Sequence, residues 1–211
     1  MTTTVEAGPE SWLADGGDPV VGYLSEVLTA VGGLAAGAGR VDDATRADRI
    51  RLLERVKAAV AAAQAAEIVQ FARSQVARQR DDGVNYRRLG KGIAEQIGLA
   101  TRTGSWHGAR KLTLARDLIG ELTRTFDLLA RGEVSEYLAQ LVATETSHLD
   151  NEARRLVDRQ LAAAGLQGFA PKNAAGQARR LAYAADPEGA VRRPGQPGRT
   201  EGCRSGRRRT P

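Results

Sequence analysis

The sequence predicts an all-α fold, and three observations carry that prediction. Hydrophobic residues make up 42% of the 211 residues but aromatic residues only 4%, so a core would consist of Leu, Val, Ile and Ala, which suits closely packed helices. Apolar residues recur at spacings of three and four in one long stripe: Leu112, Ala115, Ile119, Leu122, Phe126 and Leu129. The alternation of apolar and polar residues that is typical of β-strands is not found. We therefore expect an elongated multi-helix bundle.

The first helix is expected from Pro19 to about Leu34, after a polar, disordered N-terminus at 1–17. Asp18 can cap this helix, and proline suits its first position. Its apolar spacing predicts a buried face of Val20, Leu24, Val27, Leu28 and Val31. Glycines then end the helix, so residues 18–40 read as a short helix and a flexible joint.

A long helix is expected over about 44–80, capped by Asp42 and Asp43 and ended by Asp81 to Gly83. At about 1.5 Å per residue it would be roughly 55 Å long. The predicted apolar stripe comprises Ile50, Leu53, Val56, Val60, Ile68 and Phe71. The alanine-rich run 58–66 would let a neighbouring helix approach closely.

The remaining elements complete a helical domain over 43–186. Residues 84–118 predict two helices joined by a tight turn near Gly98, and 104–130 is either one helix or two, with Thr125 as the cap of the second. Helices over about 134–146 and 150–164 follow, the latter with Leu149, Leu156 and Leu161 as its stripe, then a weaker helix over 172–185. Residues 187–211 lose all apolar periodicity and are expected to form a disordered basic tail.

The net charge of +6 is unevenly placed, with +5 over 84–124 and +5 over 187–211. The single cysteine, Cys203, excludes internal disulfides and cysteine-rich zinc sites. Neither a secretory signal nor an apolar run long enough to span a membrane is present, which favours a cytoplasmic protein.

Catalytic chemistry is not predicted by the residues. His107 and His148 are the only histidines; they stand far apart and lack neighbouring ligands, so we expect structural or surface roles for both. No catalytic residue, metal ligand, cofactor or small-molecule substrate is expected.

The basic residues of the central segment suggest a nucleic-acid interface. Residues 93–110 partly match a helix-turn-helix, with Gly104 where an apolar residue is needed, and a turn about two residues longer would place Trp106 and Ala109 inward. The expected contacts to DNA phosphates come from six cations: Arg87, Arg88, Lys91, Arg102, Arg110 and Lys111. The alternative is a helical hairpin with a solvated basic face. The arginines at 207–209 could bind nucleic acid non-specifically, or result from an out-of-frame reading of the gene.

A family resemblance rests on an ordered set of segments: AEIVQFARSQ, AEQIGLATRTGSWHGARKLTLARDL, LTRTFDLLARGEVSEYLAQLV and TETSHLDNEARRLVDRQLAA. Together they resemble the helical domain of unknown function 222, which precedes HNH endonuclease modules in bacterial 13E12-repeat proteins. The chain departs from that pattern at Thr123, where proline is usual, and at Tyr137 and Leu138. It also departs at 187–211, which suggests a truncated or frameshifted product.

The resemblance implies a non-catalytic accessory domain of an HNH-endonuclease-type protein, as a DNA-associated module. The alternative is a helical protein-interaction or self-association scaffold without nucleic-acid contact. A metal-dependent endonuclease is a third and weaker reading.

Overall fold

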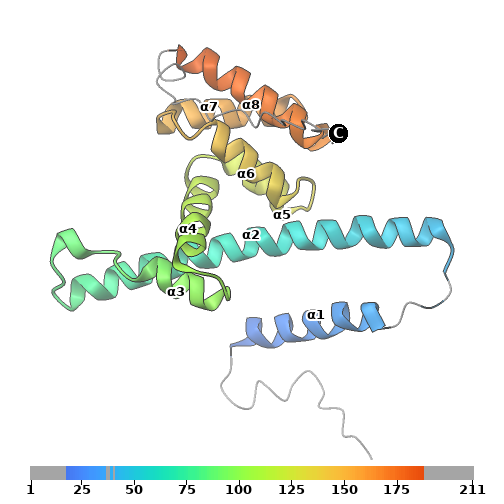
Figure 1. The fold of residues 1–211 in the computed structure, drawn as a ribbon, viewed down its shortest axis with the longest axis horizontal. Coiled ribbons are helices and arrows are strands. Elements are labelled where there is room, and N and C mark those ends of the chain that lie inside the picture. Colours follow the sequence, from blue (N-terminus) through green and yellow to red (C-terminus); the bar gives the residue numbers. More distant parts are fainter. Residues whose placement is uncertain (1–17, 37–38, 40, 188–211) are drawn as a thin grey trace, which may run out of the picture. The chain divides into compact units, whose positions relative to one another are not determined.

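The structure, a computed structural model, describes residues 18–36, 39 and 41–187, and every regular element within them is helical. The predicted all-α fold is confirmed (Figure 1). The elements are α1 Pro19–Ala36, α2 Asp43–Asp81, η1 Tyr86–Arg88, α3 Ile93–Ala100, α4 Ser105–Gly120, α5 Thr123–Ala130, α6 Glu136–Glu145, α7 Asn151–Ala163, η2 Leu166–Gly168 and α8 Pro171–Ala185. The expected disordered N-terminus, and the tail beyond Pro187 with Cys203 and the arginines at 207–209, lie outside the described residues.

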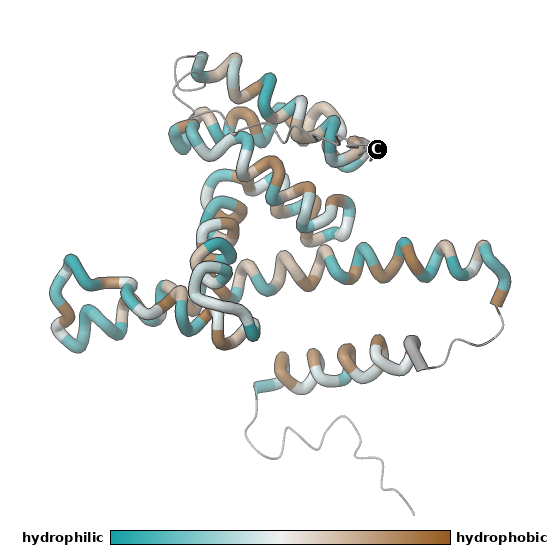
Figure 2. The backbone as a smooth tube through the Cα atoms, in the orientation of Figure 1, coloured by the Kyte–Doolittle hydropathy of each residue, from teal (hydrophilic) through white to brown (hydrophobic). Residues whose placement is uncertain are grey.

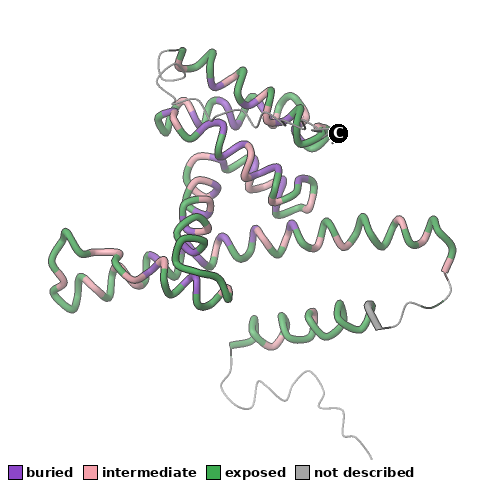
Figure 3. Tube along the Cα trace, viewed as in Figure 1, coloured by how far each residue is buried: buried purple, intermediate pink, exposed green. Residues whose placement is uncertain are grey.

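The chain divides into two compact units, Met1–Ile50 and Arg51–Pro211. In the first, Asp18 caps α1 as predicted, because its Oδ1 accepts from the Val20 amide at 2.8 Å. The predicted burial of the α1 stripe is wrong: Val20, Leu24, Leu28 and Val31 are exposed and Val27 is only partly covered (Figures 2 and 3). Helical periodicity identifies an apolar face but not a partner to cover it.

The start of α2 is capped by Asp42, as expected. Its Oδ1 accepts from the Thr45 amide at 2.8 Å and its Oδ2 from the Thr45 hydroxyl at 2.9 Å. The hydrogen bond from the Thr45 amide, with that from its hydroxyl, lowers the pKa of the Asp42 carboxyl.

The buried face of α2 is mainly its alanine face, and the predicted aliphatic stripe is confirmed only at Ile68, with Leu53 and Val56 half-buried. Ile50, Val60 and Phe71 are exposed, whereas the residues in the core are Ala58, Ala62, Ala65, Ile68, Val69 and Ala72. Small side chains bring the other helices close to the α2 backbone. Lys111 Nζ on α4 reaches Gln64 Oε1 at 2.9 Å, and the turn at Gly132 lies against Arg55.

The core of the second unit is formed by residues of the helices from α2 to α8. Figure 3 shows buried positions on these helices in purple. The predicted stripe from Leu112 to Leu129 is buried or half-buried throughout. Val134, Leu138 and Val142 are buried, and Leu149 and Leu161 are buried as expected. Leu156 is 43% exposed instead, because α7 turns Val157 and Leu161 inward.

Residues 104–130 form two helices, separated at Glu121 and Leu122. Leu122 leaves the α region, with φ −101° and ψ 46°, so the break occurs even though Thr123 replaces the proline usual in the resembling family. Thr125 does not cap α5; it is a buried residue within that helix. The cap comes from Asp158 on α7, whose carboxylate accepts from the amides of residues 124 and 125.

The later helices begin and end near the predicted residues. Ser135 caps α6 by accepting from the Leu138 amide at 3.2 Å, and Asp150 caps α7 by accepting from the Ala153 amide at 2.8 Å. Gly165 follows α7 in the left-handed conformation. Among the helices that the structure describes, none is both long and apolar enough to cross a membrane.

Candidate nucleic-acid interface

The basic segment begins in the connection between α2 and α3, which side-chain contacts hold in place. Gln79 near the end of α2 binds it at two points: Nε2 donates to the Lys91 carbonyl at 3.0 Å, and Oε1 accepts from the Gly90 amide at 2.7 Å. Asn85 caps η1 by accepting from the Arg87 amide at 3.0 Å. Arg87, Arg88 and Lys91 are exposed on this connection.

The backbones of α3 and α4 approach each other so closely that two positions at their contact have no room for a side chain. A Cβ on Gly108 would lie 2.0 Å from the Ala94 carbonyl oxygen, and one on Gly98 would lie 2.9 Å from the Gly104 carbonyl oxygen. Gly98 is therefore a residue of α3 at which the following backbone approaches closely. The turn between α3 and α4 lies at 101–104, not at Gly98 as predicted.

The predicted inward placement of Trp106 and Ala109 is wrong. Both are exposed, and Gly108 is the residue of that turn of α4 that faces α3. The reason is steric, because the two backbones meet where only glycine fits. Arg102, in the turn, is exposed and has a left-handed backbone with φ 53°.

Trp106 instead lies on the surface beneath a cation. The Arg110 guanidinium lies 4.7 Å from its ring centroid. The His107 ring is nearly perpendicular to the Trp106 ring, with the two ring centroids 4.8 Å apart. These residues line a groove of about 690 Å³ between α4 and α6. Its other lining residues include Asp117 and Glu136, so the groove carries both signs of charge.

A second hollow, of about 370 Å³, lies between α2 and α4. Arg73 and Arg80 come from α2 and Arg116 from α4, around apolar residues and Gly120. No acidic residue lines it. None of these arginines was among the six predicted contacts. Arg73 and Arg80 are far from Arg116 in sequence, and only their seven-residue spacing, two helical turns on one face, signalled a shared surface.

The six predicted cations come from three places in the chain. Arg87, Arg88 and Lys91 precede α3, Arg102 follows it, and Arg110 and Lys111 lie on α4. Lys111 is half-buried and bonded to Gln64.

What the basic residues share is the lack of acidic partners. Residues 73–116 hold ten Lys and Arg against three Asp and Glu, a net charge of +7. Among the described residues, none of these ten cations has a carboxylate within 4.0 Å. Five of the seven arginines of 117–187 do form ion pairs: Arg124, Arg131, Arg154, Arg155 and Arg179.

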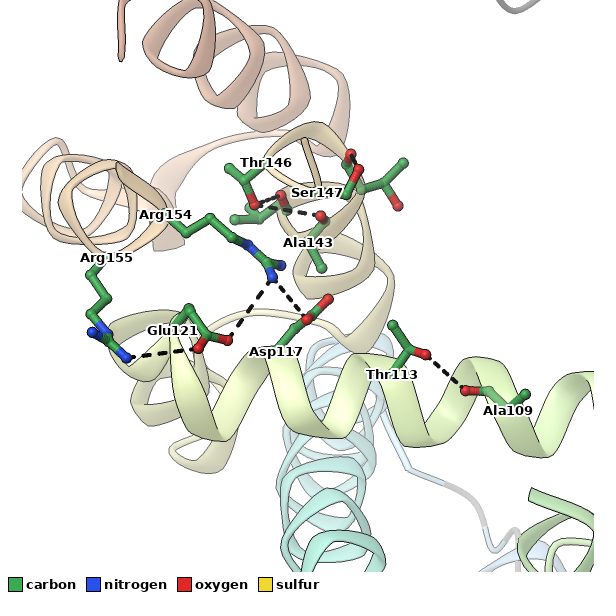
Figure 4. A network of polar contacts seen from close by, with 11 residues as sticks. Ala109, Thr113, Asp117, Glu121, Ala143, Thr146, Ser147, Arg154 and Arg155 are labelled. Carbon is green, nitrogen blue, oxygen red and sulfur yellow. Dashed lines mark hydrogen bonds and ion pairs between the residues drawn. The ribbon is translucent and has the colours of Figure 1, made fainter. Parts of the chain in front are cut away.

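Ion pairs of some acidic residues join helices of the second unit (Figure 4). Arg154 Nη1 on α7 lies 2.9 Å from Asp117 Oδ1 and 4.0 Å from Glu121 Oε2, both at the end of α4. Glu145 on α6 receives two hydrogen bonds from Arg179 on α8, at 3.0 and 2.9 Å.

Neither histidine lies in a group of ligands. In the part of the chain that the structure describes, no three His, Cys, Asp or Glu side chains are grouped so as to hold a metal ion. Both ring nitrogens of His148 are buried without a hydrogen-bond partner. His107 contacts Trp106 on the surface.

These features define a helical protein whose cations over 73–116 lie on α2, on α4 and on the two connections that flank α3. A family model described as domain of unknown function, DUF222, matches residues 50–200. The chain belongs to the DUF222 family. No curated protein and no solved structure shows significant similarity to it.

Proposed function

We propose that the chain is a non-catalytic helical module that contacts DNA through the basic surface of residues 73–116. The observation that carries the proposal is that, within the part of the chain that the structure describes, no carboxylate lies within 4.0 Å of the ten cations of this segment. Cations without partners are free to displace counterions from phosphates, which produces binding that depends on salt and tolerates sequence.

The arrangement of the surface supports this reading. Arg87, Arg88 and Lys91 stand on a connection fixed by Gln79, so their presentation costs little ordering entropy. Trp106, 61% exposed and covered by Arg110, offers an aromatic surface beside a cation.

Filter binding of the full chain to duplex DNA over a series of salt concentrations tests the proposal. We expect binding at about 50 mM salt, with affinity falling on a log–log plot with a slope of about −0.9 per phosphate contacted. Replacing Arg87, Arg88 and Lys91 by Gln should reduce that slope, whereas the matched change of Arg159, Lys172 and Arg180 should not. Absence of binding at about 50 mM salt would refute the proposal.

The accessory role in an HNH-endonuclease-type protein is the finer part of the proposal. It is supported by family membership together with the association of this domain with HNH modules that the resemblance implies. A plasmid-nicking assay with added divalent metal tests it. We expect no cleavage by the pure chain, and metal-dependent cleavage would contradict a non-catalytic role.

The second candidate is a helical self-association scaffold, and the exposed face of α1 favours it. Val20, Leu24 and Leu28 are 57%, 51% and 74% exposed, and Tyr23 and Leu34 add to the same helix. Light scattering should then show an oligomer that Leu24→Glu with Leu28→Glu converts to a monomer. A monomeric wild-type chain would rule this candidate out.

A further inference from the structure

The hollow between α2 and α4 has the chemistry of an oxyanion site. Arg73 and Arg80 are seven residues apart, so they lie on one face of α2 roughly 10 Å apart along its axis. Arg116 approaches from α4. All three are exposed, and none has a carboxylate within ion-pair distance among the described residues.

The walls of the hollow strengthen this charge. Its apolar lining consists of Val69, Ala72, Val76 and Ile119. A concave surface with cations of one sign and low-dielectric walls focuses the electric field, which raises the local concentration of anions. The groove between α4 and α6 lacks this property, because Asp117 and Glu136 line it beside Arg110.

The choice and number of cations indicate which anion fits. Guanidinium groups present paired donors that match the oxygens of phosphate or carboxylate, and here all three positions are Arg rather than Lys. One guanidinium can satisfy both oxygens of a carboxylate. Three guanidinium groups from two helices suit an anion with more oxygens, which favours phosphate.

We propose that the α2–α4 hollow binds a phosphate group through Arg73, Arg80 and Arg116. The phosphate is either one of the DNA backbone, in which case this inference rests on the proposed function, or a free phosphate. The site differs from the six cations that the sequence singled out.

Titration of the full chain with inorganic phosphate at constant ionic strength tests the site without DNA. Arginine Nε–Hε signals in ¹H–¹⁵N NMR spectra should shift and saturate at millimolar phosphate. Arg73→Gln with Arg80→Gln and Arg116→Gln should abolish the saturable shifts. The matched control, Arg87→Gln with Arg88→Gln and Arg102→Gln, should keep them. Unchanged melting temperatures confirm that both triple variants fold.

Two results would overturn the proposal: shifts that do not saturate in the wild-type chain, or saturable shifts that survive in the hollow variant. DNA filter binding then separates the two sources. A salt slope that decreases in magnitude by about 0.9 for each arginine removed assigns the phosphate to the DNA backbone. An unchanged slope, with phosphate binding lost, supports the site for free phosphate. If the wild-type chain binds no DNA, the proposed function fails while the phosphate titration still decides the site.

Discussion

Gly132 combines two requirements at one residue. Its φ of +68° is in the left-handed region that glycine adopts without strain, and a Cβ built there would lie 2.7 Å from both the Cβ and the carbonyl oxygen of Arg55. The turn between α5 and α6 thus lies directly on the α2 backbone. Gly132 also belongs to the ordered set on which the family resemblance rests.

Gly165 is a matched control for this residue. It has a similar φ of +79°, but an added Cβ would meet nothing within 4 Å. Gly165→Ala should therefore lose only the left-handed term of about 1–2 kcal/mol. Gly132→Ala should lose about 1–3 kcal/mol more, because the Arg55 backbone cannot move aside. Urea unfolding followed by circular dichroism measures both, and equal losses would show that the contact with α2 does not constrain the turn.

Asp158 is a buried carboxylate with three donors around it. Its Oδ2 accepts from the Arg124 amide at 2.7 Å, and its Oδ1 from the Thr125 amide at 3.1 Å and the Thr125 hydroxyl at 2.6 Å. Burial nevertheless raises the pKa of this carboxyl above its ordinary value, outweighing the hydrogen bonds, which lower it.

The raised pKa sets the direction of a pH dependence. The folded chain holds the Asp158 proton more tightly than the unfolded chain does, so the stabilisation from this group is full below about pH 3.9 and is lost as pH rises through the folded pKa. The free energy of unfolding of the wild type relative to Asp158→Asn should therefore decrease as pH rises from about 4. Urea unfolding of both chains at several pH values measures this difference, and an increase over that range would contradict the raised pKa.

At the scale of elements, α5 begins at a residue suited to proline. Thr123 is its first residue and its amide makes no hydrogen bond in the structure, and Leu122 before it is outside the α region. Thr123→Pro should therefore stabilise the chain by about 0.4–1 kcal/mol, through the reduced entropy of the unfolded state. Arg124→Pro is the control: it removes the amide that donates to Asp158 and should destabilise. Thermal unfolding compares the two, and destabilisation by Thr123→Pro would refute the assignment.

The sequence predicted most helices because their boundaries are local. Asp18, Asp42 and Asp150 cap helices that start within three residues of them, so their signals can be read without knowledge of the fold. The start of α5 could not be predicted in this way, because its cap is 33 or more residues away on α7. The predictions of which helix faces are buried were wrong for a related reason. The partner decides which face is covered, and α2 buries alanines where close approach matters more than side-chain size.

The candidate site was predictable in charge but not in arrangement. The basic character of 84–124 is visible in the sequence, and all six predicted cations lie in that segment. The hollow of Arg73, Arg80 and Arg116 depends on α4 meeting α2 beside the residues of 69–80. The inward placement predicted for Trp106 and Ala109 was wrong because it also depends on how helices pack. The close contact of Gly108 with α3 sets which face of α4 turns inward.

At the scale of the whole second unit, one polar cluster links α7 to the end of α4. Arg154 is only 7% exposed, and its Nη1 lies between Asp117 and Glu121 at the end of α4 (Figure 4). Arg155 on the same helix reaches Glu121 at 3.7 Å. Because Nε and Nη2 of Arg154 are buried without partners, this guanidinium is incompletely compensated. The cluster therefore specifies how α7 meets α4 more than it stabilises the fold.

Three variants test how much the Arg154 cluster contributes to stability. Arg154→Ala leaves the half-buried Asp117 without its cation, and leaves Glu121 with Arg155 alone, so it should cost about 3–5 kcal/mol. Lys57→Ala, in an exposed pair with Glu54, should cost less than about 1 kcal/mol. Arg154→Met combined with Asp117→Leu should recover most of the loss, since an apolar pair needs no desolvation of charge. Urea unfolding measures all three chains. A double variant as unstable as Arg154→Ala would show instead that the ion pair itself stabilises the contact between α4 and α7.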